Sequence, residues 1–104
     1  MPKVYKVGIS SKARGQFTGH VKFLQRESLN AAKRLVSSYK KSIARIADNP
    51  FQFPFADELD ISSLPQNTYR KCLFEERYKM LFKLEETLAI IVAVIDTRME
   101  NTDL

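Results

Sequence analysis

The last third of the chain constrains the fold more than any other part. Three segments rich in β-branched, aromatic and aliphatic residues follow one another at 69–74, 77–84 and 87–95. Only the pairs Glu75-Glu76 and Glu85-Glu86 separate them, and strands joined by so few residues run antiparallel. The pattern therefore predicts a three-stranded antiparallel meander at the end of the chain.

The faces of these strands differ in character. Every second residue of the middle segment is large and apolar: Tyr78, Met80, Phe82 and Leu84. This period of two is typical of a strand that packs one face on a core, and here the other face carries lysines. The run at 88–95 is apolar on both faces, which indicates a central strand.

The first half of the chain predicts one strand and two helices. Residues 3–10 alternate like a half-buried strand. Residues 11–26 and 28–47 carry apolar side chains at helical spacing, and Asn49-Pro50 ends the second helix. The 104 residues therefore predict one domain, 1–104, of the α+β class. We expect two helices on one face of a four-stranded, largely antiparallel sheet, in the order β-α-α-β-β-β.

A long connector follows the second helix at 50–68. It holds three of the four prolines, phenylalanines at every second position, and the acids Asp57, Glu58 and Asp60. We expect a partly ordered segment whose apolar side chains attach it to the core. A connector of this length inside a small domain also suggests a functional role.

The charge of the chain is distributed unevenly. The net charge is +5, but residues 1–49 hold eleven lysines and arginines against two acids, whereas residues 50–104 hold six against ten. Five of these cations lie opposite the apolar stripe of the second predicted helix: Lys33, Arg34, Lys40, Lys41 and Arg45. The stripe favours RNA or an acidic protein segment as a partner, unless it is simply a solvated helix face.

Several classes of protein are excluded by the composition. The single cysteine, Cys72, rules out a disulfide framework and a cysteine-based zinc site. The longest apolar run is far shorter than the roughly 20 residues that span a bilayer. We therefore expect a cytoplasmic protein without membrane contact, metal or cofactor.

The order of these elements and the residues that mark them resemble the RelE/ParE superfamily of bacterial toxins. The resemblance covers most of the chain. It is carried by Ile9-Ser10 at the end of the first strand, Ala31-Ala32 and Leu35 in the second helix, Asn49-Pro50 after it, the block from Tyr69-Arg70-Lys71 to Tyr78-Lys79, and the closing Ile95-Asp96-Thr97-Arg98.

The resemblance implies the toxin of a type II toxin–antitoxin system, with an antitoxin as partner. The basic first half of the chain predicts that the antitoxin's C-terminal segment is acidic. Two activities are open within the superfamily. RelE-like members are endoribonucleases that cut messenger RNA on the ribosome, whereas ParE-like members inhibit DNA gyrase and cut nothing. We expect the RelE-like activity, with ParE-like inhibition or a decayed antitoxin-binding module as alternatives.

The resemblance also points to candidate catalytic residues. Cleavage of RNA needs positive charge on the scissile phosphate, which arginine and lysine supply. Arg70, Lys79 and Arg98 fall at basic positions of the RelE-like site. Strand parity predicts that Arg70 and Lys79 share the face away from Tyr78 and converge on one phosphate. We also expect the side chains of Arg70 and Arg98 to be exposed at the rim of this site. Cys72 stands where a lysine is common in RelE-like enzymes, and Asp57 and Glu58 lie near a catalytic glutamate of some members.

Overall fold

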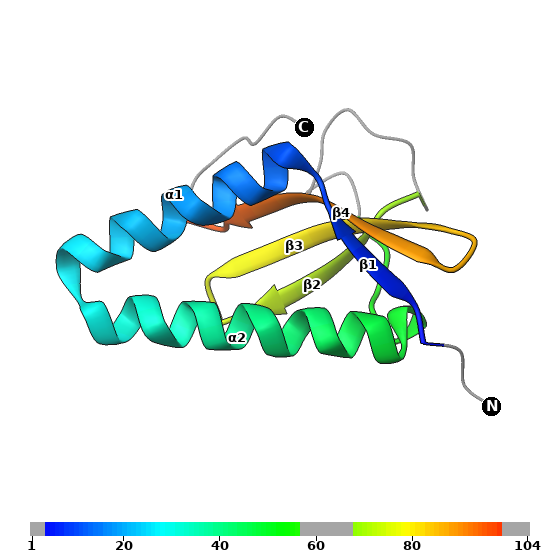
Figure 1. The fold of residues 1–104 in the computed structure, drawn as a ribbon, viewed down its shortest axis with the longest axis horizontal. Helices are drawn as coiled ribbons and strands as arrows, with labels where there is room; N and C mark the ends of the chain where they lie inside the picture. Colours follow the sequence, from blue (N-terminus) through cyan, green and yellow to red (C-terminus); the bar gives the residue numbers. More distant parts are fainter. Residues whose placement is uncertain (1–3, 57–67, 99–104) are drawn as a thin grey trace.

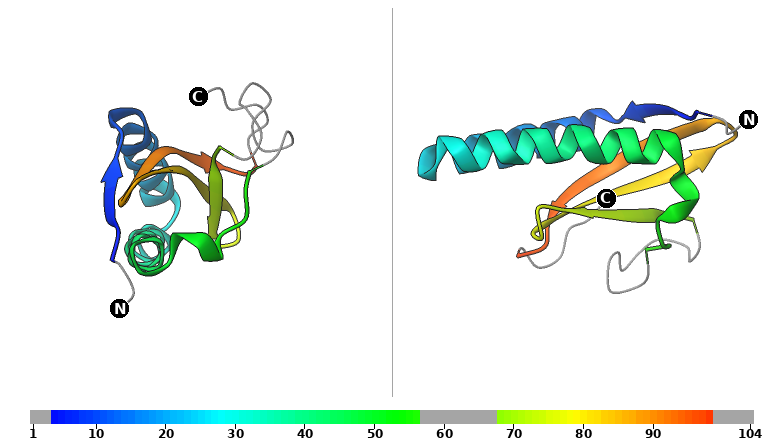
Figure 2. Two further views of the ribbon diagram at one scale, coloured as in Figure 1. Left: turned by 90° about the vertical axis from the view of Figure 1, so that its right-hand side faces the viewer. Right: turned by 90° about the horizontal axis from the view of Figure 1, so that it is seen from below.

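The computed structural model describes residues 4–56 and 68–98. Along these residues the chain forms a strand, a long helical hairpin, a single 3-10 turn and a three-stranded meander (Figure 1). Both helices lie on the same side of the sheet (Figure 2). The predicted α+β architecture and the predicted order of elements are confirmed.

The sheet has four strands in the order β1-β4-β3-β2. Their bounds are Lys6–Ile9 for β1, Arg70–Phe74 for β2, Tyr78–Glu85 for β3 and Leu88–Asp96 for β4. The meander β2-β3-β4 is antiparallel, as predicted, and β1 pairs with β4 in parallel. β4 therefore lies inside the sheet, in agreement with its apolar residues on both faces.

The two helices are α1 (Ser11–Glu27) and α2 (Leu29–Asp48), close to the predicted bounds. Each begins at a serine that caps it: the Ser10 hydroxyl accepts a hydrogen bond from the Ala13 N–H, and the Ser28 hydroxyl accepts one from the Ala31 N–H, both at 3.1 Å. After α2 the chain forms the 3-10 turn η1 (Pro50–Gln52). The tip of the hairpin extends beyond the sheet (Figure 1).

The main core lies between the helices and the sheet. It is built from apolar residues of every layer: Leu24, Leu35, Tyr39, Ile46, Phe74, Met80, Phe82 and Ile91. Complete burial of each such side chain stabilises the fold by about 1.5–3 kcal/mol. A second, smaller cluster lies on the other face of the sheet and contains Leu81, Ala93, Ile95 and Ala56. This face was predicted to be open, but its centre is buried.

Helix α1 closes the edge of β4 beyond the point where β1 ends. A bulge leaves Val92 unpaired in the register between β3 and β4. Just after it, the Val94 N–H donates to the side-chain oxygen of Gln16 (2.9 Å), and the ring Nε2–H of His20 donates to the Val94 carbonyl (2.8 Å). Two helical side chains thus satisfy backbone groups that an exposed strand edge would leave free.

The turn between β2 and β3 is one residue longer than predicted. Phe74 pairs with Tyr78, so the turn consists of Glu75, Glu76 and Arg77. A two-residue turn would have paired Arg70 with Leu81, but Arg70 pairs with Phe82. A shift of one residue moves the side chains of a strand to the opposite face.

The longer turn has a direct consequence for the predicted catalytic residues. Arg70 shares the helix-covered face with its partner Phe82, whereas Lys79 pairs with Leu73 and lies on the other face. Along β3, the partner of Arg70 is also three residue positions from Lys79, or about 10 Å at the usual rise of a strand. The prediction that Arg70 and Lys79 converge on one phosphate is therefore wrong.

Part of the predicted connector is ordered against β2. The Lys71 N–H donates to the Pro54 carbonyl (3.0 Å) and the Ala56 N–H donates to the Tyr69 carbonyl (2.7 Å), which extends the sheet at this edge. The two candidate acids of the connector, Asp57 and Glu58, lie outside the described residues.

Candidate functional site

Three lysines lie on the sheet face that points away from the helices. Lys71 is on β2, and Lys79 and Lys83 are on β3. Lys71 is paired directly with Leu81, so it points to the same side as Leu81, and alternate residues of β3 point there too. All three lysines are half-buried. We call Lys71, Lys79 and Lys83 the lysine face.

The spacing of the lysine face suits a phosphate group. Because Lys71 lies opposite Leu81, its diagonal neighbours on β3 are Lys79 and Lys83. Diagonal neighbours in an antiparallel pair are roughly 7–8 Å apart, so their long side chains reach a common anion. Lys83 also forms an ion pair with Glu85 (3.1 Å).

An apolar floor supports the lysine face. Leu81 and Ala93 are completely buried and Ile95 almost so, in contact with Ala56. The centre of this face is therefore covered, and the lysines lie around it. Lys71 was not among the candidate residues from the sequence, because the longer turn that brings it to this face has no clear sequence signal. Lys83 was predicted to lie on this face but was not a candidate site residue.

Arg70 is part of the packing and not of this face. Its Nη1 donates to the Phe53 carbonyl at 2.7 Å. The centre of its guanidinium lies 4.1 Å from the centroid of the Phe55 ring and 5.2 Å from that of Phe51. Arg70 therefore attaches the segment after α2 to the sheet through a hydrogen bond and two cation–π contacts, and the prediction that it is exposed at a rim is wrong.

Arg98, in contrast, is exposed, as predicted, just beyond β4. It lies at the same end of the sheet as Lys79, which pairs with Ile95 three residues earlier. The Arg98 backbone N–H donates to Asp96 (3.0 Å), and Arg77 Nη2 donates to the same carboxylate (2.8 Å). Burial raises the pKa of Asp96, but these hydrogen bonds outweigh burial and hold that pKa below its usual value.

The five cations of α2 do not form the single stripe that was predicted. Lys33 borders an apolar groove between the two helices, beside Val21 and Leu29. Arg34 and Lys41 line a pocket on the other flank of α2, facing Glu75. The Arg45 guanidinium lies over the Phe53 ring, 5.1 Å from its centroid. Lys40 is exposed and lies seven residues, or about two helical turns, after Lys33. The cations thus form two rows, Lys33 with Lys40 and Arg34 with Lys41.

Cys72 and His20 have structural roles in the described residues. Cys72 is completely buried, and burial raises the pKa of its thiol, so the reactive thiolate is disfavoured. His20 holds the edge of β4. Among residues 4–56 and 68–98, His, Cys, Asp and Glu side chains do not gather into a set of three that would bind a metal ion, and no helix there is long and apolar enough to cross a membrane.

The arrangement of two helices on one face of a β1-β4-β3-β2 sheet is the RelE-like toxin fold. No protein-family model matches the chain, and no curated protein matches it in sequence. The fold is shared with a chain in the crystal structure of the toxin–antitoxin complex RelBE2 from Mycobacterium tuberculosis. The two chains agree with a TM-score of 0.57 over 89% of this chain and 91% of that one, at 14% sequence identity. At this identity the likeness is one of fold.

Proposed function

We propose that this chain is the toxin of a type II toxin–antitoxin pair and that it cuts messenger RNA on the ribosome. The observation that carries the proposal is the lysine face, which places Lys71, Lys79 and Lys83 on one side of a RelE-like sheet. The RelBE2 neighbour belongs to a toxin–antitoxin complex, and this supports an antitoxin as the partner of the chain. The activity is cytoplasmic, because its substrate is translated there.

Positive charge is the contribution of this face to RNA cleavage. In the proposed reaction the 2′-hydroxyl of one nucleotide gives up its proton to water and attacks the neighbouring phosphorus, which forms a 2′,3′-cyclic phosphate. The bond to the 5′-oxygen breaks, and that oxygen takes up a proton from water. Lys71 and Lys79 bind the phosphate oxygens as negative charge grows on them, and Arg98 supplies a third cation at the same end of the sheet. Loss of one charged hydrogen bond costs about 1.5–3 kcal/mol, or roughly ten- to a hundredfold in rate.

Expression of the chain without an antitoxin tests the proposal. We expect growth arrest, with new transcript ends inside open reading frames. The double variant Lys71→Ala/Lys79→Ala removes two charges from the lysine face and is expected to abolish both effects. The variant Lys33→Ala/Lys40→Ala removes two charges from an exposed row of α2 and serves as the matched control, with wild-type cleavage expected.

Other outcomes would contradict the proposal. Growth arrest with intact transcripts and gyrase-linked DNA breaks would indicate the ParE-like alternative. The absence of arrest would indicate a decayed module that only binds an antitoxin. Equal loss of cleavage in both double variants would mean that net charge matters and that the lysine face does not.

A further inference from the structure

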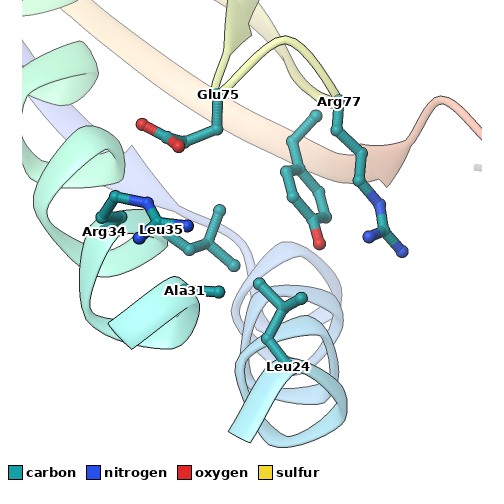
Figure 3. A pocket seen from close by; sticks show the side chains of 7 residues that line it. Leu24, Ala31, Arg34, Leu35, Glu75 and Arg77 are labelled. Atoms are coloured by element: carbon teal, nitrogen blue, oxygen red, sulfur yellow. The ribbon is translucent and has the colours of Figure 1, made fainter. Parts of the chain in front are cut away.

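A groove runs between α2 and the turn that joins β2 to β3. One end, which we call the apolar end, is a pocket of about 110 Å³ at the start of α2 that Leu24 and Ala31 line together with the charged Arg34, Glu75 and Arg77. In Figure 3, Glu75 and Arg34 lie above Ala31 and Leu24. Leu35 and Tyr78 also line this pocket. Its polar end is a pocket of about 260 Å³ lined by Arg34, Ser37, Ser38, Lys41 and Glu75. The two pockets share Arg34 and Glu75, so they lie side by side, and we call them together the groove.

The charges of the groove are available to a partner. Three charged residues of the groove form no ion pair with another described residue: Arg34, Lys41 and Glu75. Arg77, at the apolar end, is held by Asp96 instead. Tyr78 stays a neutral phenol, because burial raises its pKa above the usual value. The groove thus offers one apolar pocket, two cations along a helix flank and one acid on the facing wall.

We infer that this groove binds an acidic segment of a partner protein, with one apolar side chain in the pocket at Leu24 and carboxylates on Arg34 and Lys41. Arg34 and Lys41 are seven residues apart, which is about 10 Å along a helix. Acidic residues at this separation on the partner match them. The apolar pocket has a volume close to that of a small aliphatic group, since a cavity of about 150 Å³ accommodates benzene. The inference rests on the proposed function, in which the partner is the antitoxin.

The groove favours a protein segment over RNA for two reasons. Glu75 faces the cations from the opposite wall and repels a continuous chain of phosphates, whereas a protein segment can place a basic or neutral residue there. Aliphatic side chains and Tyr78 form part of the wall of the apolar end, beside Arg34, Glu75 and Arg77, and a chain of phosphates has no apolar group to place against them. A polyanion without apolar groups would leave this end unfilled.

A designed peptide tests the groove on the whole protein. The probe is a helical peptide of about 20 residues with a leucine, a glutamate four residues later and a second glutamate seven residues after that, all on one helical face. In nuclear magnetic resonance titrations we expect its largest amide shifts at Arg34, Lys41 and Glu75. The variant Arg34→Glu/Lys41→Glu should weaken binding by roughly tenfold or more.

Two controls make this test specific. The variant Lys33→Glu/Lys40→Glu makes the same change of charge, at the same spacing, on the other row of α2, and it should change affinity by less than about twofold. A peptide with its glutamates moved to the opposite helical face should not bind. The inference is overturned if the peptide shifts no amide signal, or if both variants lose affinity for it equally. It is also overturned if an oligouridylate shifts the same amide signals and binds more tightly than the peptide.

Neutralisation in cells separates the groove from the proposed function. Arg34→Glu/Lys41→Glu leaves the lysine face intact, so this variant should stay toxic and should no longer be rescued by the antitoxin. Rescue equal to that of the wild type would overturn the groove while leaving the toxin function standing. If the wild type is not toxic, the proposed function fails, and the peptide titration still decides whether the groove binds an acidic segment.

Discussion

At the scale of single residues, Arg70 and Lys79 show how two cations of one hairpin acquire opposite roles. Arg70 lies against Phe53 and Phe55 and holds the chain after α2 to the sheet. Lys79 lies on the far face beside Leu81. Their positions in the sequence alone do not distinguish these roles, because the length of one turn decides which face each side chain occupies.

Replacement of Arg70 by lysine tests its structural role. Lysine keeps the charge but lacks the planar group that both stacks on Phe55 and donates to the Phe53 carbonyl. We expect Arg70→Lys to lower the free energy of unfolding by about 1–2 kcal/mol and to leave RNA cleavage unchanged. Urea unfolding and a cleavage assay check this. If Arg70→Lys kept the full free energy of unfolding but lost RNA cleavage, Arg70 would act in catalysis and not in packing.

The ion pair between Arg77 and Asp96 is expected to matter more than the exposed pair between Lys83 and Glu85. Asp96 is 3% exposed, so Arg77→Ala leaves a buried carboxylate with fewer partners. We expect a loss of about 2–4 kcal/mol in the free energy of unfolding. Lys83→Ala removes an exposed pair and should cost less than about 1 kcal/mol in the same urea titration. Similar losses in both variants would contradict this account.

The same carboxylate predicts a pH dependence. The pKa of Asp96 is lowered in the folded state, so Asp96 contributes stability above its unfolded pKa of about 3.9, and this contribution is lost as the pH falls through the lower folded pKa. Wild type and Asp96→Asn should therefore differ by a constant amount near neutral pH, and the difference should shrink below about pH 4. A difference that stays constant down to pH 2 would contradict the assignment.

At the scale of elements, periodicity and capping predicted both helices and the central strand. Their signals are local: Ser10 and Ser28 cap the helices, and apolar residues recur at the helical period. The turn at Glu75 and Glu76 gave no such signal, because its left-handed residues are glutamates instead of glycine or asparagine. The protection of the β4 edge by Gln16 and His20 also joins residues more than 70 positions apart, which no local pattern reveals.

The turn between β3 and β4 also contains a glutamate in the left-handed region, Glu86. Its φ of 55° costs a non-glycine residue about 1–2 kcal/mol, whereas the extra freedom of glycine in the unfolded chain costs roughly 0.5–1 kcal/mol. Glu86→Gly should therefore raise the free energy of unfolding by about 0.5–1 kcal/mol.

The neighbouring glutamate provides the control for this change. Glu85 lies in β3 and forms an ion pair with Lys83, so Glu85→Gly should lower the free energy of unfolding by about 1 kcal/mol. Thermal unfolding of the two variants separates the effects. Destabilisation of similar size in both would show that Glu86 is not strained.

At the scale of the whole molecule, the sheet separates two basic regions. The lysine face lies on one side, and the cations of α2 lie on the helical side, where Figure 2 shows the hairpin covering the strands. In the proposed function, RNA contacts the first region, and the antitoxin contacts the row of Arg34 and Lys41 in the second. We therefore expect a bound antitoxin to block entry to the ribosome by its bulk, without contact to Lys71 or Lys79.

Cleavage of a defined messenger RNA by the purified chain tests the central claim most directly. Ribosomes stalled at a known codon are mixed with wild type, Lys71→Ala/Lys79→Ala or Lys33→Ala/Lys40→Ala, and the new RNA ends are mapped. The account predicts cuts at the stalled codon by the wild type and by the α2 variant, and a loss of roughly a hundredfold or more in cleavage rate for the lysine-face variant. Intact RNA with the wild type, or undiminished cleavage by Lys71→Ala/Lys79→Ala, would contradict it.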